Sequence, residues 1–364
     1  MERRIRVGKF IPFVALFLVI IALILCEFLI WRPARQAASL EVAPLTFAGD
    51  TPYTAVSNGI IYWEKGRLYK IDPAGRAMWN SEAAVQGTLA ASNQLTALYT
   101  ERLMQVYDEN GARLFEQSYG TDKLIMARCG QDTAAALVQT ADGGYRLDVF
   151  DRAGAQVDQI ALQDQTALKF DYAPDGKQVW VITLDTLAPS PLSRLTTYNP
   201  GKAVSGMVTA YNQVCYDALV TDENYLLIGT NNVVCYNKDG EKQYERLVYG
   251  WSVTDAAQLD KAMRLALIPQ QLDAATKLAP TQLQLATLPE GDKSLKLPDD
   301  THSVYFGRSK VYAFADRNVY TYSLSGQSEG NTLLPIDIQS VMLSPDRSFA
   351  LVSDGASVYK VPLG

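Results

Sequence analysis

Residues 58–80 read NGIIYWEKGRLYKIDPAGRAMWN, and this stretch decides the fold. Two short runs, residues 59–63 and 68–71, are rich in β-branched and aromatic side chains, which pack well on a pleated sheet. A polar turn containing Gly66 separates them, and Asp72 and Gly75 follow at the spacing of a second tight turn. The stretch therefore predicts a β-hairpin that turns into a third strand.

A weaker copy of this unit returns throughout the chain. In each copy, a strand that ends in tyrosine or an apolar residue leads into a polar turn that closes on glycine, and another apolar strand precedes it. The closing glycines are Gly75, Gly111, Gly154, Gly201, Gly240, Gly291, Gly326 and Gly364, with intervals of 35 to 51 residues. This spacing suits the four-stranded blade of a β-propeller, in which each sheet covers its neighbour.

Eight copies predict an all-β, eight-bladed propeller. The last copy ends at Gly364 without an outer strand, so we expect residues 42–47, just before the first blade, to supply it. This pairing would join the two ends of the ring and remove an exposed sheet edge. Seven blades are the alternative if the irregular sixth copy, which closes at Gly291, is an insertion.

The amino-terminal segment has a different character. Residues 10–31, FIPFVALFLVIIALILCEFLIW, are long enough as a helix to cross a hydrocarbon core of about 30 Å. Four basic residues precede this segment and two follow it, so the positive-inside rule places the amino terminus in the cytoplasm. We therefore expect a cytoplasmic tail at 1–9, a transmembrane helix at 10–31, a linker with the closing strand at 32–52, and an extracytoplasmic propeller at 53–364.

A cleaved signal peptide is the rival interpretation of residues 10–31. The apolar run exceeds the usual core of such peptides, about 7 to 15 residues, and no small-residue cleavage site follows it. The formal charge is −6 overall and +3 over residues 1–32, which leaves −9 for the remainder. An acidic propeller argues against nucleic acid as a partner.

The segment from Asp72 to Trp79 resembles the Asp-x-x-x-Gly-x-x-x-Trp docking motif of quinoprotein-like propellers, with one residue fewer before glycine. Only this copy has the tryptophan. The whole layout resembles a family of single-pass, membrane-anchored propellers of Gram-positive, clostridia-like bacteria, catalogued as a domain of unknown function. The resemblance implies WD40-like or quinoprotein-like repeats and display outside the cytoplasm, and it brings no catalytic residues.

Few side chains suggest catalysis or metal binding. His302 is the only histidine, and it has no recognisable nucleophile beside it in the sequence. The acids of the turns, Asp72, Asp108, Asp151 and Asp239, are predicted to cap hairpins rather than to bind a metal. Cys129, Cys215 and Cys235 are interpreted as buried thiols. We therefore expect no catalytic residue, no cofactor and no metal.

Two loops between second and third strands are longer than their counterparts, namely Asp185–Arg194 and Gln270–Thr281. Long loops on a rigid scaffold are frequent binding sites, although neutral drift in an exposed insertion is the alternative. The candidate partner-binding residues are Asp185, Leu187, Ser190, Arg194, Gln270, Gln271, Asp273 and Lys277.

These observations favour a membrane-anchored binding or scaffold module, held to membrane lipid by its helix, for an envelope protein or wall polymer. The alternative is an enzyme that acts on an envelope carbohydrate through carboxylates on the loop face. A signalling hub that faces the cytoplasm is a third hypothesis.

Overall fold

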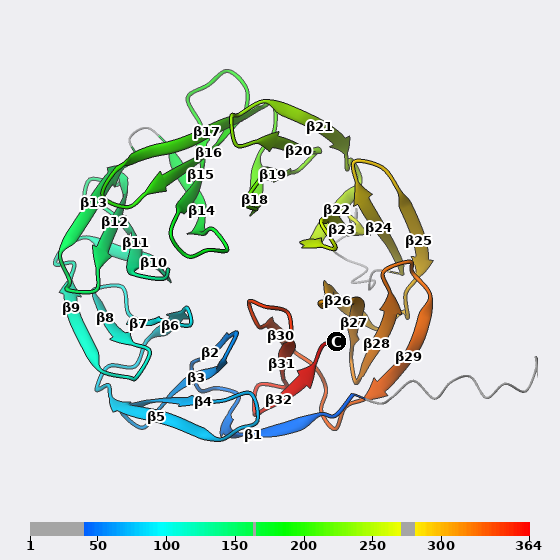
Figure 1. Ribbon diagram of the computed structural model, residues 1–364, viewed down its shortest axis with the longest axis horizontal. Helices are drawn as coiled ribbons and strands as arrows, with labels where there is room; N and C mark the ends of the chain where they lie inside the picture. The colour runs from blue at the N-terminus through cyan, green and yellow to red at the C-terminus, as the bar shows by residue number, and fades with distance from the viewer. Residues whose placement is uncertain (1–39, 163–164, 271–280) are drawn as a thin grey trace, which may run out of the picture.

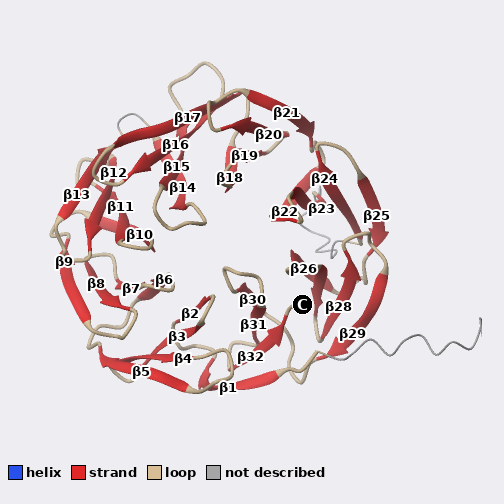
Figure 2. Ribbon diagram, in the orientation of Figure 1, coloured by secondary structure: helices blue, strands red, loops and turns tan. Residues whose placement is uncertain are grey.

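A computed structural model describes residues 40–162, 165–270 and 281–364. In these residues the structure is all-β, and eight four-stranded antiparallel sheets stand around a central axis (Figures 1 and 2). The prediction of eight blades is confirmed, and the alternative of seven is wrong because the sixth copy forms a complete sheet. Within the described ranges no helix is long and apolar enough to cross a bilayer, and the segment 10–31 lies outside them.

Each of the first seven blades takes four consecutive strands, from the axis outward. Blades 1 to 4 are β2 (Tyr53–Val56), β3 (Gly59–Glu64), β4 (Arg67–Ile71), β5 (Ala77–Glu82); β6 (Thr88–Ala91), β7 (Leu95–Tyr99), β8 (Leu103–Asp108), β9 (Arg113–Ser118); β10 (Lys123–Cys129), β11 (Thr133–Gln139), β12 (Tyr145–Asp151), β13 (Gln156–Ala161); and β14 (Thr166–Tyr172), β15 (Val179–Asp185), β16 (Leu192–Asn199), β17 (Ala203–Tyr211). Blades 5 to 7 are β18 (Cys215–Val220), β19 (Asn224–Gly229), β20 (Asn232–Asn237), β21 (Lys242–Leu247); β22 (Trp251–Leu259), β23 (Ala262–Pro269), β24 (Gln282–Leu288), β25 (Asp292–Lys296); and β26 (Thr301–Phe306), β27 (Lys310–Ala315), β28 (Asn318–Ser323), β29 (Ser328–Leu333).

Blade 8 combines the two ends of the described chain. Its inner strands are β30 (Ser340–Leu343), β31 (Phe349–Ser353) and β32 (Ser357–Pro362), and β1 (Ala43–Ala48) pairs antiparallel with β32 as the outer strand. Figure 1 shows β1 lying on the outside of β32. Closure by the segment just before the first blade therefore occurs as the repeat pattern predicts.

The repeated turn forms for a local reason. Oδ1 of Asp72 accepts hydrogen bonds from the backbone N–H groups of Ala74 and Arg76, at 2.8 and 2.9 Å. Gly75 has φ of 81°, in the left-handed region that favours glycine. Asp108 and Asp151 cap their turns in the same way, as predicted.

The prediction that Asp239 caps its turn is wrong. In blade 5, Oδ1 of Asn237 accepts the hydrogen bond from the N–H of Glu241 at 2.8 Å. The capping side chain must be the last residue of the third strand, and Asn237 occupies that position while Asp239 lies two residues further on.

The turns of blades 2 and 3 also pack against the blade before them. A Cβ at Gly111 would lie 2.6 Å from Cε3 of Trp79, on the outer strand of blade 1, and one at Gly154 would lie 2.7 Å from Cβ of Phe115 on blade 2. The place of Trp79 is thus taken in the next blade by Phe115. The tryptophan motif of the sequence marks a docking position that a different side chain fills in blade 2.

We expect Gly111→Ala to lower the free energy of unfolding by about 3 kcal/mol, because it combines a left-handed backbone with a clash against Trp79. Gly75→Ala is the matched control. Gly75 has nearly the same φ, but nothing lies within 4 Å of its Cβ position, so the backbone cost alone is expected, about 1 kcal/mol. Urea denaturation measures both, and equal losses would contradict the docking interpretation.

The ring has two different faces. Loops between second and third strands lie beside the connections between blades, because hydrogen bonds join them: Ala83 N–H donates to Gly66 O and Val248 N–H to Asn231 O, both at 2.8 Å. We call this side the loop face. The opposite side, formed by the turns between first and second strands and between third and fourth strands, is the turn face.

Candidate functional site

The first long loop is shorter than the sequence suggests. β15 continues through Asp185, which pairs with Leu192 at the start of β16, so the irregular part is residues 186–191. Leu187 and Ser190 lie exposed in this loop. Arg194 lies within β16, opposite Thr183, and its assignment to the loop is wrong because the alternation of the hairpin extends further than expected.

Asp185 has a local structural role. Its Oδ1 accepts hydrogen bonds from the N–H groups of Leu187 and Ala188, at 3.0 and 3.2 Å, so it shapes the start of the loop. This leaves the side chain of Leu187 77% exposed. Leu187 is therefore the large apolar side chain that this loop presents to solvent.

The second long loop joins β23 to β24 on the same face. Gln270 is described, and its N–H donates to Gly250 O at 2.9 Å, which ties the loop to the connection between blades 5 and 6. Gln271, Asp273 and Lys277 lie outside the described residues.

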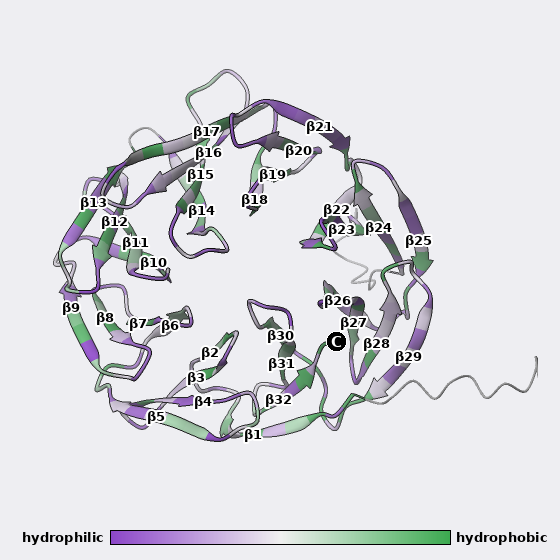
Figure 3. Cartoon of the chain, viewed as in Figure 1, coloured by the Kyte–Doolittle hydropathy of each residue, from purple (hydrophilic) through white to green (hydrophobic). Residues whose placement is uncertain are grey.

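The exposed large hydrophobic residues concentrate on the loop face. Ten are found among the described residues, and seven of them lie at loop-face ends of strands or in loop-face connections: Ile125, Leu187, Tyr211, Tyr216, Leu247, Tyr249 and Leu333. The other three, Met78, Val204 and Met207, lie on outer strands. The outer strands β21 and β25 are mostly hydrophilic, as their colour in Figure 3 shows.

Four of the seven lie on blade 5 or directly beside it: Tyr211 ends β17 of blade 4, Tyr216 and Leu247 lie on β18 and β21, and Tyr249 lies in the connection to blade 6. We call these four residues the blade-5 patch. Tyr249 is 83% exposed and Leu247 76%. The hydroxyl of Tyr216 accepts a hydrogen bond from Val253 N–H at 3.3 Å, which fixes this ring toward blade 6. On one side of the patch Leu192, which follows the 186–191 loop, pairs with Tyr211, and on the other Gln270 N–H donates to Gly250 O beside Tyr249.

His302 lies on β26, in the inner strand where the sequence places it. Its Nε2 is 2.6 Å from Oδ1 of Asp316, which lies in the loop-face turn of blade 7. Both side chains are exposed. Another loop-face acid, Glu101, pairs with Lys123 at 2.6 Å, and this pairing lowers the pKa of its carboxyl. Among the described residues these acids therefore form pairs with neighbouring basic groups.

Charged residues on inner strands and in one turn join blades around the channel. Lys169 and Asp217 lie 2.6 Å apart between blades 4 and 5, and Arg128 and Asp171 lie 3.4 Å apart between blades 3 and 4. Arg347, in the turn between β30 and β31, reaches Asp255 on blade 6. These ion pairs thus join blade 3 to blade 4, blade 4 to blade 5, and blade 8 to blade 6.

The three cysteines are buried thiols, as predicted. Burial raises the pKa of Cys129 and of Cys215 to about 12. Cys215 and Cys235 lie on the first and third strands of blade 5, which are not neighbours in the sheet. Their thiols are therefore packing groups.

Comparison with protein families decides the assignment. The family of unknown function DUF5711 matches residues 37–361. The chain belongs to this family. A comparison with curated protein sequences gives no match.

This DUF5711 chain is similar in structure to propellers of distant sequence. BamB from Moraxella catarrhalis is 12% identical, with 89% of this chain and 97% of BamB covered, at a TM-score of 0.57. The WD40 domain of SCAP from fission yeast is 11% identical, with 89% and 98% covered, at 0.60. Sqt1 from Chaetomium thermophilum, bound to the N-terminus of ribosomal protein L10, is 13% identical, with 88% and 98% covered, at 0.59. At these identities the likeness shows the WD40-like propeller fold.

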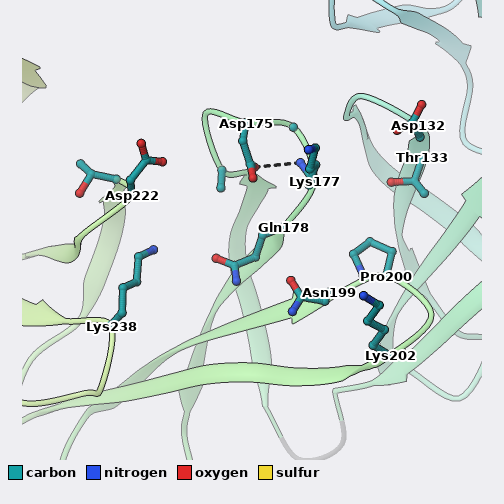
Figure 4. Close-up of a pocket in the computed structure, with 13 residues that line it drawn as sticks. Asp132, Thr133, Asp175, Lys177, Gln178, Asn199, Pro200, Lys202, Asp222 and Lys238 are labelled. Carbon is teal, nitrogen blue, oxygen red and sulfur yellow. Dashed lines mark hydrogen bonds between the residues drawn. The ribbon is translucent and has the colours of Figure 1, made fainter.

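The turn face of this DUF5711 chain carries a cavity of about 560 Å³ over blades 3 to 5 (Figure 4). Its charged lining is Lys177, Lys202 and Lys238 with Asp132, Asp175 and Asp222, so the two signs balance. Nζ of Lys238 lies 4.1 Å from the ring centre of Tyr225, and burial lowers its pKa. Asp175 is occupied in its own turn, because its Oδ1 accepts a hydrogen bond from Lys177 N–H.

Proposed function

We propose that this protein is a binding scaffold whose loop face docks a partner protein of the cell envelope, and that residues 10–31 anchor it to the membrane with the propeller outside the cytoplasm. The observation that carries the proposal is the blade-5 patch. Exposed apolar side chains scattered singly are ordinary, but seven of ten on one face favour a contact surface there.

The chemistry of the patch favours a protein partner. Tyrosine presents a large apolar ring with a polar hydroxyl and loses little side-chain entropy on binding, so tyrosines are enriched at interface hot spots. Tyr211, Tyr216 and Tyr249 are held at strand ends or in tight connections, and this rigidity lowers the entropy cost of docking. The fold supports the same function, since Sqt1 is a propeller of similar structure bound to a polypeptide.

The proposed anchor would keep the ring near the membrane. Trp31 and Leu40 are nine residues apart in the sequence, and a chain of this length spans at most about 32 Å. Leu40 is fastened to the rim, where its N–H donates to Oγ1 of Thr332 on blade 7 at 2.9 Å. We therefore propose a partner that is itself in the membrane or close to its surface.

The loop-face hypothesis predicts selective loss of the partner. In living cells, a variant carrying Tyr211→Ser, Leu247→Ser and Tyr249→Ser is expected to give at least about tenfold less crosslinked partner than the wild type. Quantitative mass spectrometry measures the amount of partner. The matched control carries Met78→Ser, Val204→Ser and Met207→Ser, which removes similar exposed apolar groups from the rim. Equal partner recovery from both variants would place recognition elsewhere.

The proposed location of the propeller outside the cytoplasm is tested separately. Protease added to intact protoplasts is expected to degrade the propeller and spare residues 1–9, whereas a propeller in the cytoplasm would be protected until the membrane is lysed. Protection in intact protoplasts with digestion after lysis would overturn the extracytoplasmic assignment.

A further inference from the structure

A second cavity, of about 820 Å³, opens at the turn-face end of the central channel. We call it the channel-mouth cavity. Blades 8, 1, 2, 3 and 4 surround it, and the β14–β15 turn, which includes Asp175 and Gly176, separates it from the cavity of Figure 4. It lies on the opposite face from the blade-5 patch, so a ligand here would not compete with a partner docked there.

The inner strands around the channel differ in length. Those of blades 8, 1 and 2, β30, β2 and β6, have four residues each, whereas the inner strands of blades 3 to 7 have six to nine. The three blades with short inner strands are neighbours in the ring. On the other side, the longer strands carry the ion pairs that join neighbouring blades.

Uncharged polar groups of blades 1, 2 and 3 line the cavity. They are Thr54, Ser57, Ser92, Asn93, Gln94 and Gln131. Ser92 is fixed in place because its Oγ donates to Gly130 O at 2.7 Å, and Oδ1 of Asn93 accepts from Asn58 N–H at 3.3 Å. The side-chain amides of Gln94 and Gln131 have no hydrogen-bond partner among the described residues. Each of these amides therefore offers donors and an acceptor to a ligand.

One ion pair completes the wall. Nε of Arg128 lies 3.4 Å from Oδ2 of Asp171, and Oδ1 of Asp171 accepts a hydrogen bond from Tyr172 N–H at 2.8 Å. The Asp171 side chain is 43% exposed to the channel, yet the surrounding protein desolvates it and raises its pKa. Because Arg128 balances Asp171, the pair adds hydrogen-bonding capacity without much net charge.

From this lining we propose that the channel-mouth cavity binds a neutral oligosaccharide. Sugar hydroxyls both donate and accept, which matches side-chain hydroxyls and amides that do the same. Met342, Leu343 and Pro345 supply an apolar wall for the C–H faces of sugar rings. The volume falls within the range of small-ligand pockets, about 300 to 1,000 Å³. An anionic ligand would require an excess of cations, which this lining does not have.

The test uses the full chain in detergent. Its binding to three neutral probes, maltotetraose, cellotetraose and chitotetraose, is measured by titration calorimetry and saturation-transfer NMR. We expect at least one probe to bind. The variant Gln94→Leu with Gln131→Leu is expected to weaken that binding about tenfold, a loss typical of unpaired ligand hydroxyls. The control Gln117→Leu removes an amide from the outer strand β9 and is expected to leave affinity unchanged.

Salt dependence separates ligand classes. Raising NaCl from about 50 to about 500 mM should leave the affinity for a neutral probe nearly unchanged, since no ion pair with the ligand is screened. Absence of binding by all three probes, or equal binding by the Leu variant, would overturn the proposal. The anionic tetrasaccharide tetragalacturonate serves as a fourth probe. Binding of this probe alone, abolished by salt, would also overturn the proposal. The loop-face crosslinking experiment reads a different surface, so failure of one proposal does not imply failure of the other.

Discussion

Arg347→Met is expected to lower the free energy of unfolding by about 3 kcal/mol, because it leaves Asp255 as a largely buried carboxylate without its partner. The guanidinium of Arg347 donates to both oxygens of Asp255, at 2.6 and 2.9 Å, and to the carbonyls of Ala256 and Phe306. The Asp255 side chain is only 11% exposed, and its Oδ2 also accepts from Phe306 N–H. One side chain of blade 8 thus holds the inner strands of blades 6 and 7.

Chemical denaturation of a double-mutant cycle measures this contact. Asp255→Asn keeps the volume of the side chain and removes its charge, and combining it with Arg347→Met should cost less than the sum of the two single losses. The control is Arg152→Met, which removes an exposed pair with Glu109 at 2.6 Å and is expected to cost less than about 1 kcal/mol. If Arg347→Met costs no more than Arg152→Met, the contact between blades 6 and 8 contributes little.

The fold is predictable because its signals are local and repeated. Asp72 and Gly75 form their turn with hydrogen bonds that span at most four residues, and copies of the same turn recur near each blade's outer strand. The strand count followed from these turns, and the pairing of β1 with β32 followed from the missing outer strand of the last copy. Repetition therefore compensates for the weakness of each single copy.

The contacts across the channel could not be predicted in the same way. Asp255 and Arg347 are 92 residues apart, and neither lies in a motif. Their meeting depends on ring closure, which sets the distance from blade 8 to blade 6. A sequence pattern indicates which residues share a strand face, but not which turn reaches into the channel.

The blade-5 patch was missed for another reason. Both faces of a propeller sheet are buried between blades, so an apolar residue at either alternating position is expected in the core. Tyr225 and Tyr249 look alike in the sequence, yet Tyr225 is 2% exposed and Tyr249 is 83% exposed. The difference is that Tyr249 lies beyond the last pairing of β21, and strand ends are the least predictable boundaries.

Phe47→Ala is expected to destabilise the protein by about 4 kcal/mol, the cost of deleting a buried aromatic ring. Phe47 is 3% exposed on β1, and its ring stacks on Tyr62 of blade 1 with centroids 4.4 Å apart. It also packs with Phe349 and Leu351 of blade 8. The side chain therefore lies at the seam where the last blade meets the first.

The matched control is Met78→Ala, which truncates a large apolar residue on the outer strand β5 of blade 1, where it is 49% exposed. We expect a loss below about 0.5 kcal/mol there. Urea denaturation followed by tryptophan fluorescence compares the two, and a similar small loss for both would mean that β1 is dispensable for closure. β1 is also the first described strand after the proposed anchor. A large loss of stability for Phe47→Ala would therefore mean that the six residues that close the ring also connect it to the proposed anchor.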